Sequence, residues 1–219
     1  MKKKFVGYIA FFVVLFVGYL FFVFAGNDNW KKTSPVISYV KPFRFTTQDS
    51  LAFTEKDLQG KVCLVNYFFT NCKGICPRMN NNMHKLYDEF KGESDFMILS
   101  HTCDPERDSV KTLKHYADSL KVDERKWVFV TGRKDSLYNM ARNSYLLDDP
   151  KNSVEKIEDQ FLHTQFFALV DKNGQVRGQV YDGLKQDELN KLKEAIKTLL
   201  KEKAGNSNFS NGIFTNNPQ

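Results

Sequence analysis

The 21 residues from Phe5 to Ala25 contain no charged side chain. A helix of this length and composition can cross roughly 30 Å of hydrocarbon, whereas the apolar part of a secretory signal peptide usually has about 7 to 15 residues. Lysines at positions 2–4 precede the run and favour an N-terminus held in the cytoplasm. The sequence therefore predicts a membrane anchor at residues 1–26, which contacts the membrane through residues 5–25.

We expect a single-pass protein of the bacterial inner membrane, with its C-terminal domain on the periplasmic, extracytoplasmic side. Lys31 and Lys32 weaken this orientation signal. Val23-Phe24-Ala25 loosely fits a cleavage site, so removal of the segment is the alternative.

The remaining chain divides into a linker, a domain and a tail. Residues 27–42 are polar and contain the Ser34-Pro35 break, which predicts a linker. Residues 43–203 are long enough for one domain of ordinary size. Residues 204–219 carry no charge and include five asparagines, so we expect a disordered tail.

The formal net charge is +6, and half of it comes from the three leading lysines. Lysines and acidic residues interleave in residues 185–203, a pattern typical of a solvated helix face. Nucleic-acid binding would require clustered basic residues. We therefore expect no nucleic-acid partner.

Apolar runs alternate with amphipathic stretches in residues 43–203, which indicates an α/β domain. Strands are predicted at 43–46, 51–53, 62–69, 95–102, 127–131, 166–170 and 175–181. Helices are predicted at 77–91, 109–120, 135–145 and 186–203. This order predicts a mixed sheet flanked by helices, with the turn after residue 69 at the carboxyl end of a central strand, where open α/β sheets build their sites.

Cys72 and Cys76 lie on this turn, directly before a helix that begins at Pro77. Proline at the first helical position makes Cys76 the expected N-cap, with its sulfur directed at free N–H groups of the first turn. The helix end and the basic neighbours Lys73 and Arg78 favour thiolate over thiol. Two cysteines at this spacing can also form a disulfide in the metal-free protein. A purely structural disulfide or a pair of buried free thiols is the alternative.

His163 directly precedes the apolar strand predicted at 166–170. Taken alone, a histidine at the start of a strand is more often structural than a ligand. Beside two thiolates it becomes a candidate, because two soft sulfurs and one imidazole form a low-coordinate set suited to copper.

Other histidines and cysteines are weaker candidates. His84 follows Cys76 by eight residues, about 12 Å along the helix, too far to share a ligand with the cysteines. His115 fits a helix surface, while His101 and Cys103 end the strand next to the cysteine-bearing one and could approach the same rim. For His101 and Cys103, a capping residue and a buried small residue are the simpler interpretations. Core packing is the simpler interpretation of Cys63, Met79 and Met83.

These motifs together resemble the Sco/SenC family. The resemblance rests on Phe-Phe-Thr-Asn-Cys72-Lys-Gly-Ile-Cys76-Pro77, then Asp104-Pro105-Glu106-Arg107-Asp108, then His163 before a strand and an Asp-Lys-Asn-Gly turn. It runs from about Phe43 to Leu200.

The resemblance implies a membrane-anchored, thioredoxin-like metallochaperone rather than an enzyme. It implies that Cys72, Cys76 and His163 bind one copper ion, Cu⁺ or Cu²⁺. The implied role is in cytochrome c oxidase assembly, with the binuclear copper site of oxidase subunit II, or another exported copper protein, as the recipient.

The chain departs from the family pattern at three places. Leu162 stands where an aspartate often precedes the histidine, so this chain lacks that carboxylate as a partner for the imidazole. Ser109-Val110 replaces the common Thr-Pro at a helix start. Cys103 replaces an apolar residue and adds a third thiol near the site.

The alternative function is an exported thiol-disulfide oxidoreductase or redox sensor that uses Cys72 and Cys76. Its usual motif is Cys-x-x-Cys, whereas the spacing here is one residue longer. Such enzymes also usually place a cis-proline before the strand facing the cysteines, but no proline lies between Pro150 and Pro218. Both observations favour metal binding.

Overall fold

The computed structural model describes residues 2–25, 34–72, 74–152, 156–157, 160–162 and 164–205. They belong to two compact units, Met1–Ser34 and Pro35–Gln219. Four predicted features lie wholly or partly outside the described residues: the candidate ligand His163, the basic neighbour Lys73, residues 27–33 of the linker and almost all of the tail, residues 206–219.

The first unit contains helix α1, which covers Lys2–Ala25. The side chains at positions 5–19 are exposed. Over the part of the chain that the structure describes, no helix meets the length and apolar character needed to cross a membrane. The transmembrane anchor stays a prediction from the sequence.

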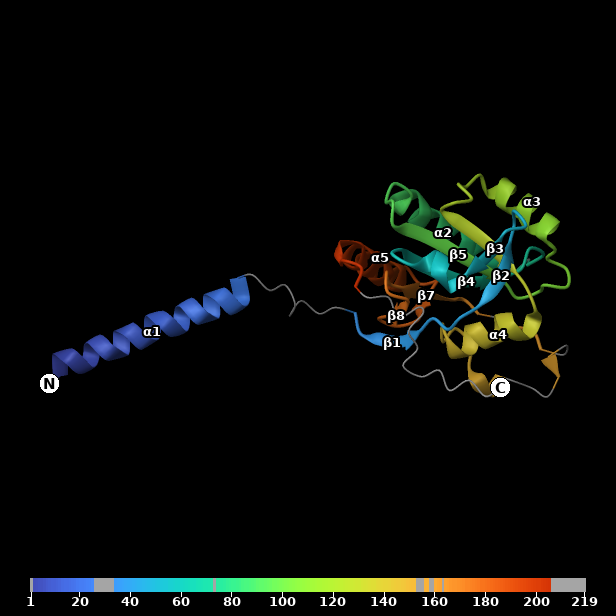
Figure 1. Ribbon diagram of the computed structural model, residues 1–219. Coiled ribbons are helices and arrows are strands. Elements are labelled where there is room, and N and C mark those ends of the chain that lie inside the picture. The colour runs from blue at the N-terminus through green and yellow to red at the C-terminus, as the bar shows by residue number, and fades with distance from the viewer. Residues whose placement is uncertain are drawn as a thin grey trace. The chain divides into compact units, whose positions relative to one another are not determined.

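The strands of the second unit form one mixed sheet in the order β1-β8-β7-β4-β5-β6-β2-β3, with β9 beside β7 (Figure 1). Strands β4, β5 and β6 are parallel to one another, and the other pairings are antiparallel. The strands are β1 (Val36–Tyr39), β2 (Arg44–Thr47), β3 (Ala52–Thr54), β4 (Val62–Phe68), β5 (Phe96–Thr102), β6 (Trp127–Thr131), β7 (Phe166–Val170), β8 (Gln175–Arg177) and β9 (Tyr181–Asp182).

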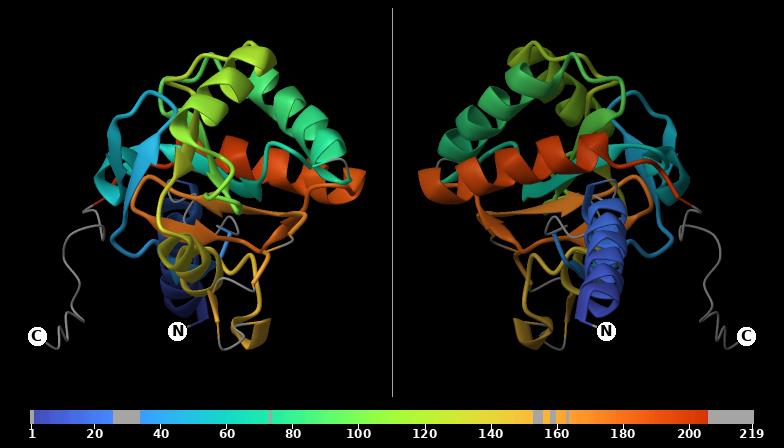
Figure 2. Two further views of the ribbon diagram at one scale, coloured as in Figure 1. Left: turned by 90° about the vertical axis from the view of Figure 1, so that its right-hand side faces the viewer. Right: turned by 90° about the vertical axis from the view of Figure 1, so that its left-hand side faces the viewer.

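Helices cover both faces of this sheet (Figure 2). Successive side chains of a strand point to opposite faces, so Leu64 and Phe68 of β4 pack with α2, α3 and α5, whereas Val65 and Tyr67 pack with α4. The helices are α2 (Cys76–Phe90), α3 (Val110–Leu120), α4 (Lys134–Asn143) and α5 (Gln186–Lys201); short 3-10 turns cover Glu55–Leu58 and Pro150–Asn152. The predicted mixed sheet flanked by helices is confirmed.

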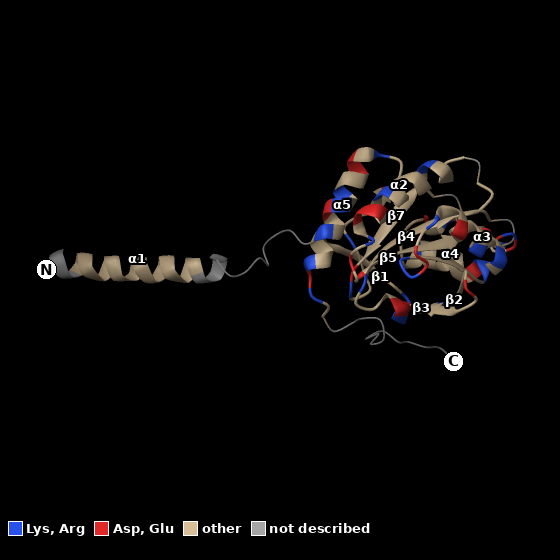
Figure 3. Ribbon diagram, turned by 90° about the horizontal axis from the view of Figure 1, so that it is seen from above, with Lys and Arg blue, Asp and Glu red and all other residues tan. Residues whose placement is uncertain are grey.

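Basic and acidic residues interleave along α5, as predicted for a solvated helix face (Figure 3). The apolar face of this helix packs on the sheet through Leu192 and Ile196. On its charged side, Lys193 and Lys197 contact Glu89 of α2 at 2.6 and 3.7 Å.

Two predictions of strand extent are wrong. β1 lies inside the stretch predicted to be linker and pairs with β8, so the folded domain begins earlier than residue 43. The single strand predicted at 175–181 is two strands, because Gly178 has φ of 80° and turns the chain between β8 and β9. β2 and β3 form an antiparallel hairpin, and Gly174, with φ of 77°, ends the Asp-Lys-Asn-Gly turn.

His101 of β5 is fully buried on the face that α4 covers. Its ring stacks on Tyr67 at a centroid separation of 4.9 Å and contacts the rings of Phe45 and Tyr145 at 5.5 and 5.3 Å. Neither ring nitrogen has a hydrogen-bond partner among the described residues. Burial lowers the pKa of His101 to about 3, and the nearby Asn66 backbone opposes this shift only in part.

We expect His101 to make the fold sensitive to acid. Its pKa rises from about 3 in the folded chain to 6.5 in the unfolded chain, so unfolding takes up a proton between these values. Stability therefore falls as the pH drops below 6.5, by at most about 1.4 kcal/mol per pH unit from this group. In urea unfolding between pH 4 and 6, the free energy of unfolding of His101→Leu should depend less steeply on pH than that of the wild-type chain. A substitution of the exposed His115, His115→Gln, should leave this dependence unchanged. A slope that His101→Leu does not alter would contradict the assignment.

Candidate metal and thiol site

The two cysteines lie where the central strand β4 passes into α2. Cys72 is partly exposed and Cys76 is buried. Both line a pocket of about 400 Å³. Its other lining residues are Phe69, Thr70, Pro77, Asn80, Asn81, His84, Tyr116 and Leu120. The predicted position at the carboxyl end of a central strand is confirmed.

The start of α2 differs from the prediction by one residue. Cys76 is the first helical residue and Ile75 is the N-cap, which puts Pro77 at the second position. The Ile75 carbonyl accepts the N–H groups of Arg78 and Met79 at 3.1 and 3.0 Å. These N–H groups are therefore not directed at the Cys76 sulfur, and the predicted N-cap role of Cys76 is wrong.

Cys72 instead receives the free N–H groups at this helix start. Burial alone would raise the pKa of the Cys72 thiol, but hydrogen bonds to its sulfur lower the pKa overall. The donors are the Cys76 thiol and the backbone N–H groups of Cys76, Gly74 and Ile75. N–H groups directed at a sulfur favour the thiolate, as expected at the N-terminus of a helix.

Cys76 has the opposite tendency. Burial raises its pKa to about 12, and the adjacent Cys72 sulfur adds to the effect by accepting the Cys76 proton in a hydrogen bond. The backbone N–H of Phe69 opposes this shift only in part. The pair is thus one thiolate-prone sulfur next to one thiol donor, an arrangement suited to binding a soft metal or to disulfide exchange.

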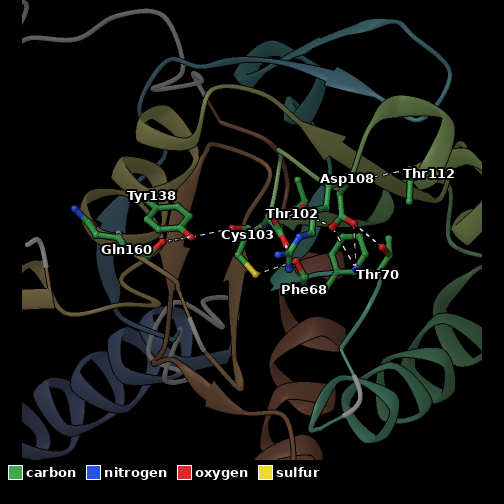
Figure 4. A network of polar contacts seen from close by, with 10 residues as sticks. Phe68, Thr70, Thr102, Cys103, Asp108, Thr112, Tyr138 and Gln160 are labelled. Carbon is green, nitrogen blue, oxygen red and sulfur yellow. Dashed lines mark hydrogen bonds and ion pairs between the residues drawn. The ribbon is translucent and has the colours of Figure 1, made fainter. Parts of the chain in front are cut away.

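A buried carboxylate fixes the strand end that leads to the cysteines (Figure 4). Asp108 is 1% exposed and accepts the hydroxyls of Thr70 and Thr102 at 2.5 and 2.6 Å. It also accepts the Thr70 N–H at 3.2 Å. These bonds join the end of β4 to the end of β5. Because Thr70 lies two residues before Cys72, the loop that carries Cys72 begins from a fixed position.

All four cysteines are free in the structure. Cys63 is fully buried in the core, and burial raises the pKa of its thiol. Cys103 is also buried, and its sulfur donates to the Phe68 carbonyl at 3.1 Å. The predicted disulfide between Cys72 and Cys76 stays a prediction.

Of the other candidates, only His84 is among the described residues that line the pocket of this pair. His101 belongs to the opposite face of the sheet, so it does not reach the rim. His115 is exposed, and Met79 and Met83 are core residues, as predicted. His84 lines the same pocket as the two cysteines, and its ring nitrogen also contacts Asp88, outside the pocket lining, at 3.2 Å. Ser109 caps α3, since its hydroxyl accepts the Thr112 N–H.

Leu162, the residue before the candidate ligand His163, is described and buried. Its N–H donates to the hydroxyl of Tyr138 on α4 at 3.1 Å. Tyr138 belongs to no motif in the sequence, because its partners are backbone atoms of distant segments. Among the residues that the structure describes, no group of three or more His, Cys, Asp or Glu side chains could hold a metal.

The SCO1/SenC family model matches residues 31–201. The chain belongs to the SCO1/SenC family. It is 35% identical over 161 residues to the SCO1 protein homolog of Bacillus subtilis, an alignment that covers 72% of this chain and 80% of that one. It is 28% identical over 161 residues to the mitochondrial SCO2 protein of Saccharomyces cerevisiae, covering 71% of this chain and 52% of the yeast protein.

Solved Sco structures share the fold. BsSco, a member of the Sco family of cytochrome c oxidase assembly proteins in which a disulfide switch was identified, superposes with a TM-score of 0.64 at 32% identity, covering 78% of this chain and 98% of its own. Copper-bound yeast Sco1 superposes with a TM-score of 0.55 at 26% identity, covering 74% and 94%. The mixed sheet with flanking helices is therefore the thioredoxin-like Sco fold.

The unequal environments of the two thiols predict unequal reactivity. In the metal-free, reduced protein at pH 8, iodoacetamide should modify Cys72 more than about 10-fold faster than Cys76, because the thiolate is the nucleophile. Cys76→Ala removes a donor and should shift the pH profile of Cys72 alkylation upward. Peptide mass mapping shows the order in which the cysteines are alkylated. Buried Cys63 is the internal control, because it should react only on unfolding. Faster labelling of Cys76 would contradict the assignment.

Proposed function

We propose that this chain is a membrane-anchored copper-binding protein that serves the assembly of cytochrome c oxidase. Its proposed ligands are Cys72, Cys76 and His163, which would bind one copper ion as cargo. The proposed recipient is the binuclear copper site of oxidase subunit II or another exported copper protein.

The observation that carries the proposal is the paired sulfur arrangement of Cys72 and Cys76. Both cysteines line one pocket at the end of β4, and hydrogen bonds from the Cys76 thiol and from N–H groups at the helix start lower the pKa of Cys72. Soft thiolates favour copper in its reduced form, and a metal that replaces the shared proton would hold both sulfurs as thiolates. The partly exposed pocket leaves these sulfurs accessible to a partner.

The relatives support the same conclusion. Yeast Sco1 has been solved with copper bound, and BsSco belongs to a family of cytochrome c oxidase assembly proteins. Cys72 and Cys76 line the pocket, which a soluble copper source can reach, whereas Cys63 and Cys103 are buried and are not among its lining residues. The pocket cysteines are therefore the sulfur donors that this chain offers to an incoming metal.

The anchor is part of the proposal and rests on the sequence alone. The uncharged residues 5–25 behind three lysines support a single-pass inner-membrane protein with a periplasmic domain. A copper site of an exported oxidase subunit would then lie on the same side of the membrane as the cysteine pair.

A second function remains a candidate because of one observation: BsSco contains a disulfide switch. A thiolate-prone Cys72 next to the Cys76 thiol also suits thiol-disulfide exchange or redox sensing. Such a reaction would use the two sulfurs and would not require His163.

Copper titration separates these functions. The reduced protein should bind about one copper ion, and Cys72→Ser, Cys76→Ser or His163→Ala should each weaken binding by at least about 10- to 100-fold, the range typical even of changes beyond the direct ligands. Cys63→Ser, His84→Ala and His115→Ala are the controls and should bind normally. Competition with a chromophoric Cu⁺ chelator measures the affinities.

The copper-delivery proposal fails under a specific combination of results. His163→Ala would bind copper normally and support full oxidase activity, while Cys72→Ser would raise the oxidised or misbridged fraction of exported proteins. That combination would favour the oxidoreductase alternative.

Topology is tested separately. The chain should stay in the membrane fraction after carbonate extraction, because residues 5–25 would be buried in lipid. Protease added to spheroplasts should digest the region beyond about Gly26. Recovery of a soluble mature chain that starts near Gly26 would show that the segment is a cleaved signal.

A further inference from the structure

We propose that Tyr138 is a positioning residue for the proposed copper site: its hydroxyl fixes the segment that leads into His163 against the strand ends that carry the cysteines. This inference rests on the proposed function, because it concerns how the third ligand is held. It adds a residue from α4, a helix that carries none of the proposed ligands.

The Tyr138 hydroxyl joins two segments that are distant in sequence (Figure 4). It donates to the Cys103 carbonyl, just beyond β5, at 2.8 Å, and it accepts the Leu162 N–H at 3.1 Å. The Gln160 carbonyl lies farther away, at 3.4 Å. Because a hydroxyl has one proton and accepts through its lone pairs, the bonds to Cys103 and Leu162 can form together.

The connection continues from Cys103 to the cysteine pair. The Cys103 N–H and sulfur both donate to the Phe68 carbonyl, at 2.8 and 3.1 Å. The next N–H along the strand, that of Phe69, is directed at the Cys76 sulfur. Residues 160–162 are therefore connected to the end of β4. The connection runs from the Tyr138 hydroxyl through the backbone of Cys103 to the peptide group between Phe68 and Phe69.

A ring contact supports the same placement. The rings of Phe69 and Phe161 meet edge to face, with centroids 5.1 Å apart and planes at 90°. Phe69 directly follows β4, and its carbonyl accepts the Cys72 N–H at 3.2 Å. Residues 160–162 are thus held beside the cysteine loop by both a ring contact and the Tyr138 hydroxyl.

Leu162 explains why a backbone connection matters in this chain. Its side chain is apolar and only 3% exposed, so it cannot orient a neighbouring imidazole by a hydrogen bond. Orientation of a histidine ligand normally depends on such outer contacts. On the N-terminal side of His163 the Leu162 N–H donates to Tyr138, and on the other side the Thr164 hydroxyl accepts the Phe166 N–H from its own segment.

The Tyr138 ring is independently anchored. It is fully buried, and the cations of Lys134 and Arg142 lie 5.8 and 5.6 Å from its centre. Burial raises the pKa of Tyr138 to about 12, so the hydroxyl keeps its proton at neutral pH. Tyr138→Phe would retain the ring contacts and remove only the hydroxyl.

Tyr145→Phe is the matched control. Tyr145 is also fully buried on the side of the sheet that α4 covers, but its hydroxyl has no hydrogen-bond partner among the described residues. In the full-length protein in detergent, Tyr138→Phe should weaken copper binding about 10- to 100-fold. Tyr145→Phe should leave the affinity unchanged. The nitrogen hyperfine signal of Cu²⁺ in electron paramagnetic resonance should weaken in Tyr138→Phe only.

A double-mutant cycle distinguishes positioning from general destabilisation. If Tyr138 acts through His163, the hydroxyl deletion should cause no additional loss of affinity in the His163→Ala background. An equal loss in both backgrounds, or normal copper binding by Tyr138→Phe while His163→Ala binds weakly, would overturn the inference and leave the proposed function intact. Normal binding by His163→Ala would overturn the proposed ligand set itself.

Discussion

The peptide group between Phe68 and Phe69 is the point on which the site depends. Its carbonyl accepts the Cys103 N–H and sulfur, and its N–H is directed at the Cys76 sulfur. The C=O and N–H of a trans peptide point in opposite directions. One planar group therefore faces the Cys103 sulfur on one side of the strand and the Cys76 sulfur on the other. Asp108 holds the next residue, Thr70, through its N–H and hydroxyl. The cysteine loop therefore starts from a strand end whose orientation is set by several bonds.

This fixed strand end makes two chemically identical residues different. Cys72 lies among N–H donors of the helix start and tends toward thiolate, whereas Cys76 is buried and tends to keep its proton. A cation that displaces the shared proton would remove this difference, and so would oxidation to a disulfide. The same geometry thus accounts for both the copper proposal and its redox alternative, and the third ligand is what separates them.

Sequence periodicity predicted the strands and helices well, because alternating and amphipathic patterns report which side of an element faces a core. It could not predict the start of α2, since the loop backbone lets the Ile75 carbonyl, rather than Cys76, take the free N–H groups. β1 was missed because none of its four residues is buried, so it lacks the alternating pattern of a half-buried strand. The role of Tyr138 was invisible because an aromatic residue on an amphipathic helix predicts core packing, and only the folded chain brings Leu162 to its hydroxyl.

The central claim is that copper is held by both pocket cysteines and one histidine. X-ray absorption at the copper edge of the copper-loaded, full-length protein tests it most directly, because sulfur and imidazole scatter distinctly. We predict two sulfur ligands and one imidazole per copper in the wild-type chain, and two sulfurs without that imidazole in His163→Ala. A wild-type spectrum with fewer than two sulfurs, or with the same imidazole contribution in His163→Ala, would contradict the account.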